Sequence, residues 1–287
     1  MLIDLQLHST YSDGFLTPKE LASFLADQGV KIASLTDHNT VGGLAQFRNA
    51  CDKKGIKTIN GIEIYVTHKN KRMNILWYNF DEENADLHKV LRNSHIRRRG
   101  SVRKILEKLV KRGLKLDIEK VLDKYIRYIP INHVIEDIWS VPANRAKIKK
   151  ELDKKSPREE DIIFAYFRNP AIGKLRETHI SLEKILKIRK KAGGQIILNH
   201  PAKHGFIKKK RWEDLNKLGV DGVELISPHH SIGAIMYIQQ LAAHLDFITT
   251  GGSDFHKHEG DNYLIQNYSQ YFRVDSKYLR KIEKIIG

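Results

Sequence analysis

Residues 2–14, LIDLQLHSTYSDG, join an apolar run directly to the polar residues His8 and Asp13. The run from Leu2 to Leu7 predicts a short buried β-strand, so His8 stands at the C-terminal end of that strand. In parallel α/β folds the C-terminal ends of the strands meet at one rim, and active-site residues gather there. This stretch therefore predicts an α/β fold and places a candidate functional site at a strand end.

The alternation of strand and helix continues beyond this first strand. A capping box at Thr17–Glu20, with proline at the first helical position, begins a helix that Gly29 ends. Further strands are predicted at residues 31–36, 57–66, 73–80, 195–199, 222–226 and 246–250, and further helices at 42–54, 211–218, 232–244 and 276–286. Strands that alternate with helices of this length indicate parallel βαβ units.

The middle of the chain has a different pattern, because strand-like runs nearly vanish and basic amphipathic helices dominate. One apolar stripe at helical spacing consists of Val102, Ile105, Leu106, Leu109 and Val110, and more helices are predicted around 133–149, 159–167 and 181–191. We therefore expect a discontinuous barrel domain, residues 1–80 and 192–287, and an inserted basic helical subdomain, residues 81–191.

The charge of the chain is high and uneven. The formal net charge is +16, and residues 89–120 contain twelve Lys or Arg against three Asp or Glu, a net charge of +9. Such a segment attracts polyanions and phosphorylated ligands. A solvated helix face in a lysine-rich protein has the same composition, so charge alone does not predict nucleic-acid binding.

Other bulk features argue against several classes of protein. No run of 18 apolar residues is present, so neither a transmembrane helix nor a membrane partner is expected. The N-terminus lacks the basic region and cleavage site of a signal peptide. The single cysteine, Cys51, excludes an internal disulfide and fits a reducing cytoplasm. We therefore expect a cytoplasmic protein, and the sequence does not indicate its oligomeric state.

Metal-ligating residue types stand at the ends of the predicted strands. They are His8, Asp13, His38, Glu63, His200, Asp254 and His256. Imidazole and carboxylate together suit Zn, Mn or Fe, whereas an all-oxygen set suits Mg or Ca. Glu63 lies within an apolar strand and needs a partner there, because a buried unpaired carboxylate is unfavourable. Each residue alone is a weak signal, but the set predicts a shared metal site.

These residues lie in six short motifs. The motifs are Asp4–Ser9 (DLQLHS), Ser12–Gly14 (SDG), Thr36–Thr40 (TDHNT), Gly61–Ile64 (GIEI), Asn199–Pro201 (NHP) and Gly252–His256 (GSDFH). Through them the whole chain, insertion included, resembles the PHP (polymerase and histidinol phosphatase) family of metal-dependent phosphoesterases. It looks closest to stand-alone members that act on nucleoside 3′,5′-bisphosphates and short RNA 5′ ends. The resemblance implies a distorted (β/α)7 barrel that holds up to three divalent metal ions at its C-terminal mouth, with Mn, Zn or Fe expected and Mg an alternative.

The resemblance also implies how the ligands are shared. One metal would use Gln6, His8, Glu63 and Asp254, a second Glu63, Asn74 and His200, and a third Asp13, His38 and His256. The family usually has histidine where this chain has Gln6 and Asn74, so only the third set is intact. A carboxamide oxygen is a poorer donor to Zn or Fe than imidazole is. We therefore expect weaker occupancy of the first two positions, or a shift toward Mn or Mg.

Two further histidines are implied to contact the substrate. His230 matches a position where the family often has a histidine near the substrate phosphate. His133 lies where relatives have an Arg-x-His motif, although Ile131 replaces the arginine.

The function expected from these features is phosphate-ester hydrolysis. A metal-bound hydroxide would attack the phosphorus of a phosphorylated nucleotide or short RNA, with Glu63 as the metal bridge and His8 as a second catalytic residue. Basic residues of the insertion would hold the rest of the substrate. Two alternatives stay open: a catalytically impaired protein that binds nucleic acid or another polyanion, and a phosphatase for a small metabolite such as histidinol phosphate.

Overall fold

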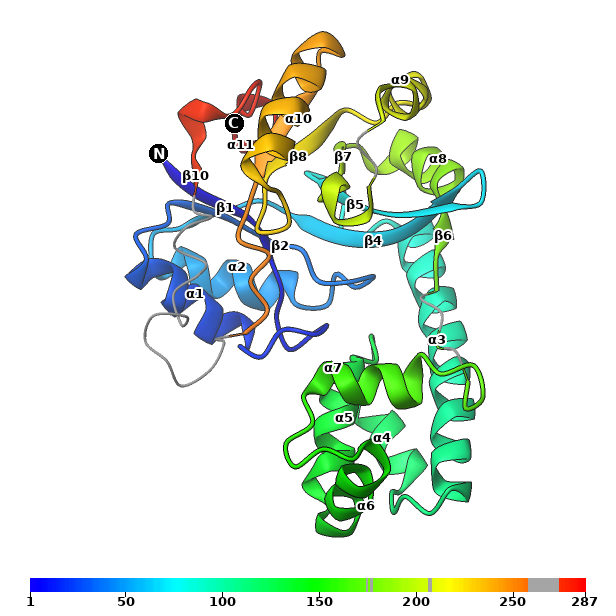
Figure 1. The fold of residues 1–287 in the computed structure, drawn as a ribbon. Coiled ribbons are helices and arrows are strands. Elements are labelled where there is room, and N and C mark those ends of the chain that lie inside the picture. Colours follow the sequence, from blue (N-terminus) through cyan, green and yellow to red (C-terminus); the bar gives the residue numbers. More distant parts are fainter. Residues whose placement is uncertain (174, 176–177, 206–207, 258–273) are drawn as a thin grey trace. The chain divides into compact units, whose positions relative to one another are not determined.

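The computed structural model describes residues 1–173, 175, 178–205, 208–257 and 274–287 (Figure 1). The chain forms two compact units, one of Met1–Val90 with His179–Gly287 and one of Leu91–Thr178. The second unit is therefore an insertion in the first. The domain bounds expected from the sequence stay a prediction, since compactness alone does not define an independently folding domain.

The smaller β-sheet of the first unit contains β1 (Leu2–Leu7) at its centre. β1 lies between β10 (Val274–Asp275) and β2 (Ile32–Leu35), and β3 (Lys57–Thr58) pairs with β2. β2 runs parallel to β1 and to β3, whereas β10 runs antiparallel to β1. β1 and β2 are buried almost throughout, as their apolar runs predict.

The larger sheet has the strand order β6-β4-β5-β7-β8-β9. Its strands are β4 (Gly61–His68), β5 (Lys71–Tyr78), β6 (Ile180–Ser181), β7 (Gln195–Leu198), β8 (Gly222–Ile226) and β9 (Ile248–Gly251). β7, β8 and β9 are parallel, as are β4 and β6. The predicted α/β fold class is confirmed.

Two isolated bridges pair residues of the two sheets or of the loops that follow them. Leu7 of β1 pairs with Phe255, beyond β9, and His38, beyond β2, pairs with Glu63 of β4. These bridges bring the C-terminal ends of β1, β2 and β9 together with the first residues of β4. Closure into a (β/α)7 barrel stays a prediction.

β5 departs from the expected parallel order, since it pairs antiparallel with both β4 and β7. His68 opposes Lys71 across a tight loop whose residues, Lys69 and Asn70, have φ angles of 46° and 60°. Positive φ at both loop residues matches the twist of a two-residue hairpin. The expectation of parallel βαβ units is therefore wrong here, and the predicted strand 57–66 is two strands in different sheets.

Helices pack against the sheets of the first unit (Figure 1). They are α1 (Pro18–Asp27), α2 (Leu44–Asp52), α8 (Leu182–Ala192), α9 (Lys209–Leu218), α10 (Ile232–His244) and α11 (Glu283–Ile286), with 3₁₀ turns at Pro201–His204 and Ser276–Tyr278. α1 begins at the predicted capping box, in which Thr17 and Glu20 exchange side-chain and backbone hydrogen bonds. Within the described ranges, every helix is too short or too polar to cross a bilayer.

The C-terminal segment is not the single helix expected over 276–286. Between its 3₁₀ turn and α11, the chain docks on β9. The Thr249 N–H donates to the Arg280 carbonyl at 3.0 Å, and the Thr249 hydroxyl accepts from the Arg280 N–H at 2.7 Å. These contacts use backbone groups that a continuous helix would need. The predicted helix is therefore wrong in its middle.

The second unit is helical. α3 (Ala85–Lys111) begins in the first unit and continues into the second, followed by α4 (Ile118–Lys124), α5 (Ile131–Ser140), α6 (Pro142–Leu152), α7 (Glu159–Ile162) and a π-helical turn at Ile163–Phe167. The predicted α3 stripe enters the core of this unit except for Val110, which is 38% exposed. The helix expected over 133–149 is two helices, because Pro142 begins a new one.

Candidate metal centre

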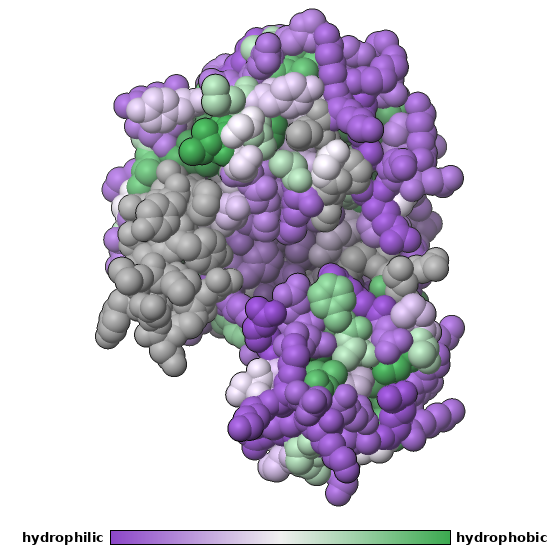
Figure 2. Space-filling model, viewed as in Figure 1, coloured by the Kyte–Doolittle hydropathy of each residue, from purple (hydrophilic) through white to green (hydrophobic). Residues whose placement is uncertain are grey.

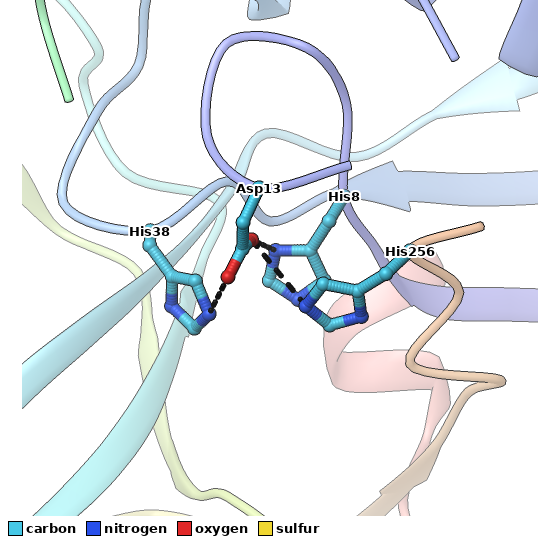
Figure 3. A group of neighbouring side chains, drawn as sticks. All are labelled: His8, Asp13, His38 and His256. Carbon is cyan, nitrogen blue, oxygen red and sulfur yellow. Dashed lines mark ion pairs between the residues drawn. The ribbon is translucent and has the colours of Figure 1, made fainter. Parts of the chain in front are cut away.

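Three imidazoles surround the Asp13 carboxylate (Figure 3). His8 follows β1, His38 follows β2 and His256 follows β9. Asp13 Oδ1 lies 3.8 Å from His8 Nδ1 and 3.4 Å from His256 Nε2, and Asp13 Oδ2 lies 3.5 Å from His38 Nε2. One ligand atom of each residue lies within 4.8 Å of those of the other three, so the four can hold one metal ion.

A second group of potential ligands shares His8. Its Nε2 atom lies 3.2 Å from Glu63 Oε2 and 3.2 Å from Asp254 Oδ1, and these three residues also satisfy the distances for a metal ion. Glu63 belongs to β4 and Asp254 follows β9. The two nitrogens of one imidazole therefore face different carboxylates, and the two candidate sites are neighbours.

His200 approaches the other oxygen of Glu63, with 3.4 Å between His200 Nε2 and Glu63 Oε1. The backbone N–H of His200 donates to the buried Glu224 carboxylate at 3.1 Å. The φ angles of His200 and Asp254 are 21° and 49°, a range that non-glycine residues rarely adopt and that recurs at functional sites. All seven metal-type residues identified in the sequence thus lie in one connected cluster, and their role as ligands stays a prediction.

The two carboxamides at the substituted ligand positions both bond to Glu63. Gln6 Nε2 donates to Glu63 Oε2 at 3.4 Å, and Asn74 Nδ2 donates to Glu63 Oε1 at 2.5 Å. They adjoin the carboxylate that was expected to bridge metals, but they present N–H groups to it. Neutral donors of this kind satisfy a carboxylate without any metal.

Asp37 anchors the loop that carries the first ligands. It accepts hydrogen bonds from the Ser9 N–H at 2.8 Å, the Ser9 hydroxyl at 2.7 Å and the Ser12 hydroxyl at 2.5 Å. Gly14 closes the same loop, and a Cβ atom there would lie 2.3 Å from the His8 carbonyl oxygen. Sequence reasoning missed this anchoring role, and the serines on both sides of the loop were the available signal.

Asp4 anchors the loop after β9. It accepts from the N–H and the hydroxyl of Ser253 at 3.0 Å and 2.6 Å, immediately before Asp254. Burial raises the pKa of Asp4 to about 7, although the hydrogen bonds from Ser253 oppose the rise. The two-residue period of a strand could have revealed this residue, because Asp4, Gln6 and His8 share one face of the chain.

Burial and charge act in opposite directions on the cluster. Burial disfavours a charged His8, but the carboxylates of Asp254 and Glu63 outweigh it and raise the pKa of His8 well above its usual value. Burial likewise opposes ionisation of Glu63, but the imidazoles of His38 and His200 hold its pKa well below normal. The carboxylates are therefore anionic and attract positive charge.

Unmet hydrogen-bonding capacity in the cluster fits a metal ion. Within the part of the chain that the structure describes, neither ring nitrogen of His8 makes a well-aligned hydrogen bond, and nor does Asp254 Oδ1, although all three atoms are buried. Buried polar atoms are nearly always paired. Since imidazole nitrogen and carboxylate oxygen are ligands of Zn, Mn and Fe, the residues present fit a divalent cation.

Of two adjacent histidines, His229 faces the cluster. Its Nε2 atom lies 2.7 Å from Asp254 Oδ2 and 3.0 Å from Lys203 Nζ. His230 is buried, with Nδ1 2.9 Å from the Leu225 carbonyl oxygen, and burial lowers its pKa to about 4. A substrate contact by His230 stays a prediction, while the geometry adds His229 and Lys203, which sequence reasoning missed. Adjacent loop histidines have no periodicity that shows which one faces a site.

His133, the other histidine expected near the substrate, lies in α5 of the second unit. Its Nδ1 atom is 3.1 Å from Glu136 Oε2, and its ring centroid is 6.5 Å from that of Tyr125. Both contacts are internal to the second unit, and a role in substrate binding stays a prediction.

Known proteins resemble nearly the whole chain. Residues 4–130 match the family model of the PHP domain. The chain is 25% identical over 260 residues to phosphoribosyl 1,2-cyclic phosphate 1,2-diphosphodiesterase of Eggerthella lenta, covering 89% of the chain and 94% of the relative. It is 26% identical over 265 residues to 3′,5′-nucleoside bisphosphate phosphatase of Chromobacterium violaceum, covering 88% and 87%. It is 25% identical over 256 residues to a 5′-3′ exoribonuclease of Haemophilus influenzae, covering 88% and 89%.

A solved structure shares the fold. It is a protein of Bifidobacterium adolescentis designated a metal-dependent phosphoesterase, with a TM-score of 0.73 and 20% identity over 91% of this chain and 89% of that one. Because the match covers 91% of this chain, the fold similarity extends well beyond residue 130 and includes the later strands.

Proposed function

Because the chain carries a PHP domain, we propose that it is a metal-dependent phosphoesterase that hydrolyses phosphate esters of nucleotides or of short RNA 5′ ends. The observation that carries this proposal is the convergence of His8, His38 and His256 on Asp13. Hydrolysis of a phosphate ester at neutral pH requires a nucleophile and positive charge beside the phosphorus. A protein-bound divalent cation supplies both when it is present.

The residues of the cluster divide into two groups by position. The Asp13 group would hold one cation, for which its nitrogen-rich donors favour Zn, Mn or Fe over Mg. Glu63, with Asp254 and His200, would bridge toward a further cation on the other side of His8. Glu63 and Asp254 are buried and anionic, and they hold the imidazole of His8 in the orientation that either cation would require.

Lys203 and His229 are the candidate substrate contacts. Their side chains are 39% and 30% exposed, so both reach solvent at the edge of the cluster. Both lie beside Asp254 Oδ2, at 3.9 Å and 2.7 Å. An ammonium and an imidazole N–H at this position can donate hydrogen bonds to a phosphoryl oxygen and offset its negative charge.

The names of the relatives support ribose phosphate esters as the substrate class. They describe action on a phosphoribosyl cyclic phosphate, on a nucleoside bisphosphate and on RNA. Each of these compounds carries phosphate esterified to ribose. We propose the same class for this chain, with nucleoside 3′,5′-bisphosphates and 5′-phosphorylated short RNA as the first candidates.

The test is phosphate release by the purified chain after metal removal and reloading with Mn, Zn or Fe. The substrates are a nucleoside 3′,5′-bisphosphate, a 5′-phosphorylated short RNA, a ribose 1,2-cyclic phosphate and histidinol phosphate. We expect metal-dependent hydrolysis of at least one nucleotide substrate, its loss in His256→Ala and its retention in the exposed control His244→Ala. Absence of hydrolysis with every metal would refute the proposal, and activity on histidinol phosphate alone would assign a small-metabolite phosphatase.

The hydrogen bonds of Gln6 and Asn74 favour one second candidate, a non-catalytic protein that binds polyanions. Neutral donors already occupy both Glu63 oxygens, which weakens the case for a bridging ligand. Salt-sensitive RNA binding without turnover in any metal would support this candidate. Turnover of a nucleotide substrate would exclude it.

A further inference from the structure

Part of the positive charge that stands out in the sequence is engaged in contacts within the second unit. The Arg98 side chain is buried, donates to the Ile129 carbonyl at 2.7 Å and lies 4.3 Å from the centre of the Tyr128 ring. Farther along the same helix, Arg99 pairs with Asp123 and Arg103 pairs with Glu119, at 2.6 Å and 2.8 Å. These arginines hold α3 to its neighbours. The +9 segment therefore has fewer available cations than its composition indicates.

Available lysines gather instead in a groove of the first unit. The groove has a volume of about 340 Å³ and lies between the start of α3 and α8, since residues of both helices line it. It is lined by Asp86, Lys89, Val90, Lys184, Lys187, Ile188 and Lys191, all of which belong to the first unit. The face shown in Figure 2 is mostly hydrophilic. The groove differs from such a surface because lysines from two helices converge on one hollow.

The lysines of α8 share one helical face. Lys184, Lys187 and Lys191 are three and four residues apart, the spacing that aligns side chains on a helix. Asp86 pairs with Lys191 at 3.0 Å. Among the described residues, no carboxylate lies within 4.0 Å of the ammonium groups of Lys89, Lys184 or Lys187. Four lysines and one aspartate thus leave the groove with a net charge of +3.

The shape of the groove distinguishes it from a solvated lysine face. Val90 and Ile188 line it and are only 4% and 5% exposed, so its floor is packed. Exposed ammonium groups stand around this floor on both helices. A chain of negative charges laid along the hollow would contact lysines on two sides, which a flat surface does not allow.

We propose that this groove binds the phosphodiester backbone of single-stranded RNA. Lysine binds phosphate as a mobile point charge, so the groove would recognise the backbone and no particular base. The choice of RNA rests on the proposed function, in which phosphorylated RNA is a substrate class. The groove belongs to the same compact unit as the candidate metal centre and would raise the affinity for an oligonucleotide above that for a mononucleotide.

The test is fluorescence anisotropy of a fluorescein-labelled oligouridylate over a series of salt concentrations. The variant Lys184→Gln/Lys187→Gln removes two phosphate contacts, so the slope of log K against log salt falls in magnitude by about 1.4 and affinity falls roughly 25-fold at 0.1 M salt. Lys53→Gln/Lys54→Gln is the matched control, because it removes the same charge from exposed lysines at the end of α2. Asp86→Asn removes an acidic residue that lines the groove and should tighten binding.

The outcomes separate this proposal from the proposed function. Equal weakening in both double variants would assign binding to net charge and overturn the groove. RNA binding that is insensitive to salt would also overturn the groove proposal. Binding of anionic phospholipid vesicles in place of RNA would overturn it as well. Selective weakening in the groove variant without any hydrolysis would support the groove and count against the phosphoesterase. Hydrolysis of a nucleoside bisphosphate, together with unchanged RNA affinity in the groove variant, would support the phosphoesterase and count against the groove.

Discussion

Asp13 and Glu63 are both carboxylates among imidazoles, yet their surroundings differ. Three imidazoles face Asp13, whose side chain is 24% exposed. Glu63 is 1% exposed, and although three imidazoles also approach it, at 3.2, 3.8 and 3.4 Å, two carboxamide N–H groups donate to it as well. Asp13 therefore has the open, nitrogen-rich surroundings of a metal ligand. Glu63 has those of a buried carboxylate that neutral donors already stabilise.

This contrast shows that the residue type alone does not settle the role of a carboxylate. What decides it is whether the neighbouring side chains present lone pairs or N–H groups toward the same point. Imidazoles can present either, since their tautomer adapts, whereas Gln6 and Asn74 present N–H groups to Glu63. The Asp13 side should therefore bind metal more tightly than the Glu63 side.

Replacing Asp13 should have the largest effect. In Asp13→Asn the anionic centre of the three imidazoles is lost, so we expect metal affinity to fall more than roughly 100-fold, beyond the loss typical of a residue that only supports a ligand. The measurement is metal content after dialysis, together with a calorimetric titration. Asp52→Asn, at the exposed end of α2, is the control. Undiminished affinity in Asp13→Asn would remove the basis of the comparison.

Restoring imidazole beside Glu63 should have the next largest effect. In Gln6→His/Asn74→His the N–H donors are replaced by nitrogen ligands, so we expect the chain to bind about one more equivalent of Zn or Mn. Metal counting by mass spectrometry measures this independently of activity. The exposed Gln240→His controls for an added surface histidine. Unchanged stoichiometry would mean that Glu63 is not limited by its carboxamide neighbours.

Loosening the loop beside Asp13 should have a moderate effect. In Asp37→Asn the hydrogen bonds to Ser9 and Ser12 are weakened, and with them the placement of His8. We expect metal affinity to fall by about 10- to 100-fold, the range for residues that orient ligands. The titration used for Asp13→Asn measures it. A loss equal to that of Asp13→Asn would indicate that Asp37 is itself a ligand.

His230 should affect pH-dependent stability and leave the metal centre unchanged. Burial lowers its pKa to about 4, below the usual value near 6.5. A lowered pKa stabilises the fold above pH ~6.5, and this stability is lost as the pH falls toward 4. Between pH 7 and pH 5 the loss is about 2 kcal/mol.

Urea unfolding of wild type and His230→Asn at the two pH values tests this effect. The variant should lose less stability on acidification than wild type, whereas the exposed control His244→Asn should match wild type. An identical pH dependence in all three would show that His230 is not held neutral by the fold.

Much of the fold follows from local patterns. β1, β8 and α10 have the bounds that their apolar periodicity predicts, because each is a single uninterrupted element packed on one core. β5 and the C-terminal segment were mispredicted for another reason. The hairpin turn at Lys69 and Asn70 reverses the chain, and Thr249 captures the backbone of Arg280. Neither contact leaves a period in the sequence.

The candidate site likewise has features that the sequence predicts and features that only tertiary contacts decide. Strand-end positions bring His8, His38 and His256 together, since parallel strands end at one rim. The orientation of Gln6 and Asn74 toward Glu63 and the choice between His229 and His230 depend on side-chain directions in space. Charge shows the same limit, because Arg99 and Arg103 of α3 add to the charge counted in the sequence but are paired with carboxylates in the fold.

The sequence by itself determined the α/β class, the strand ends and the inventory of metal-type ligands, because apolar periodicity and residue chemistry are local properties. The tertiary structure alone decided which donors face which carboxylate and which lysines are available to a ligand. Those outcomes depend on distances of a few ångströms between side chains far apart in the chain, and only packing sets such distances.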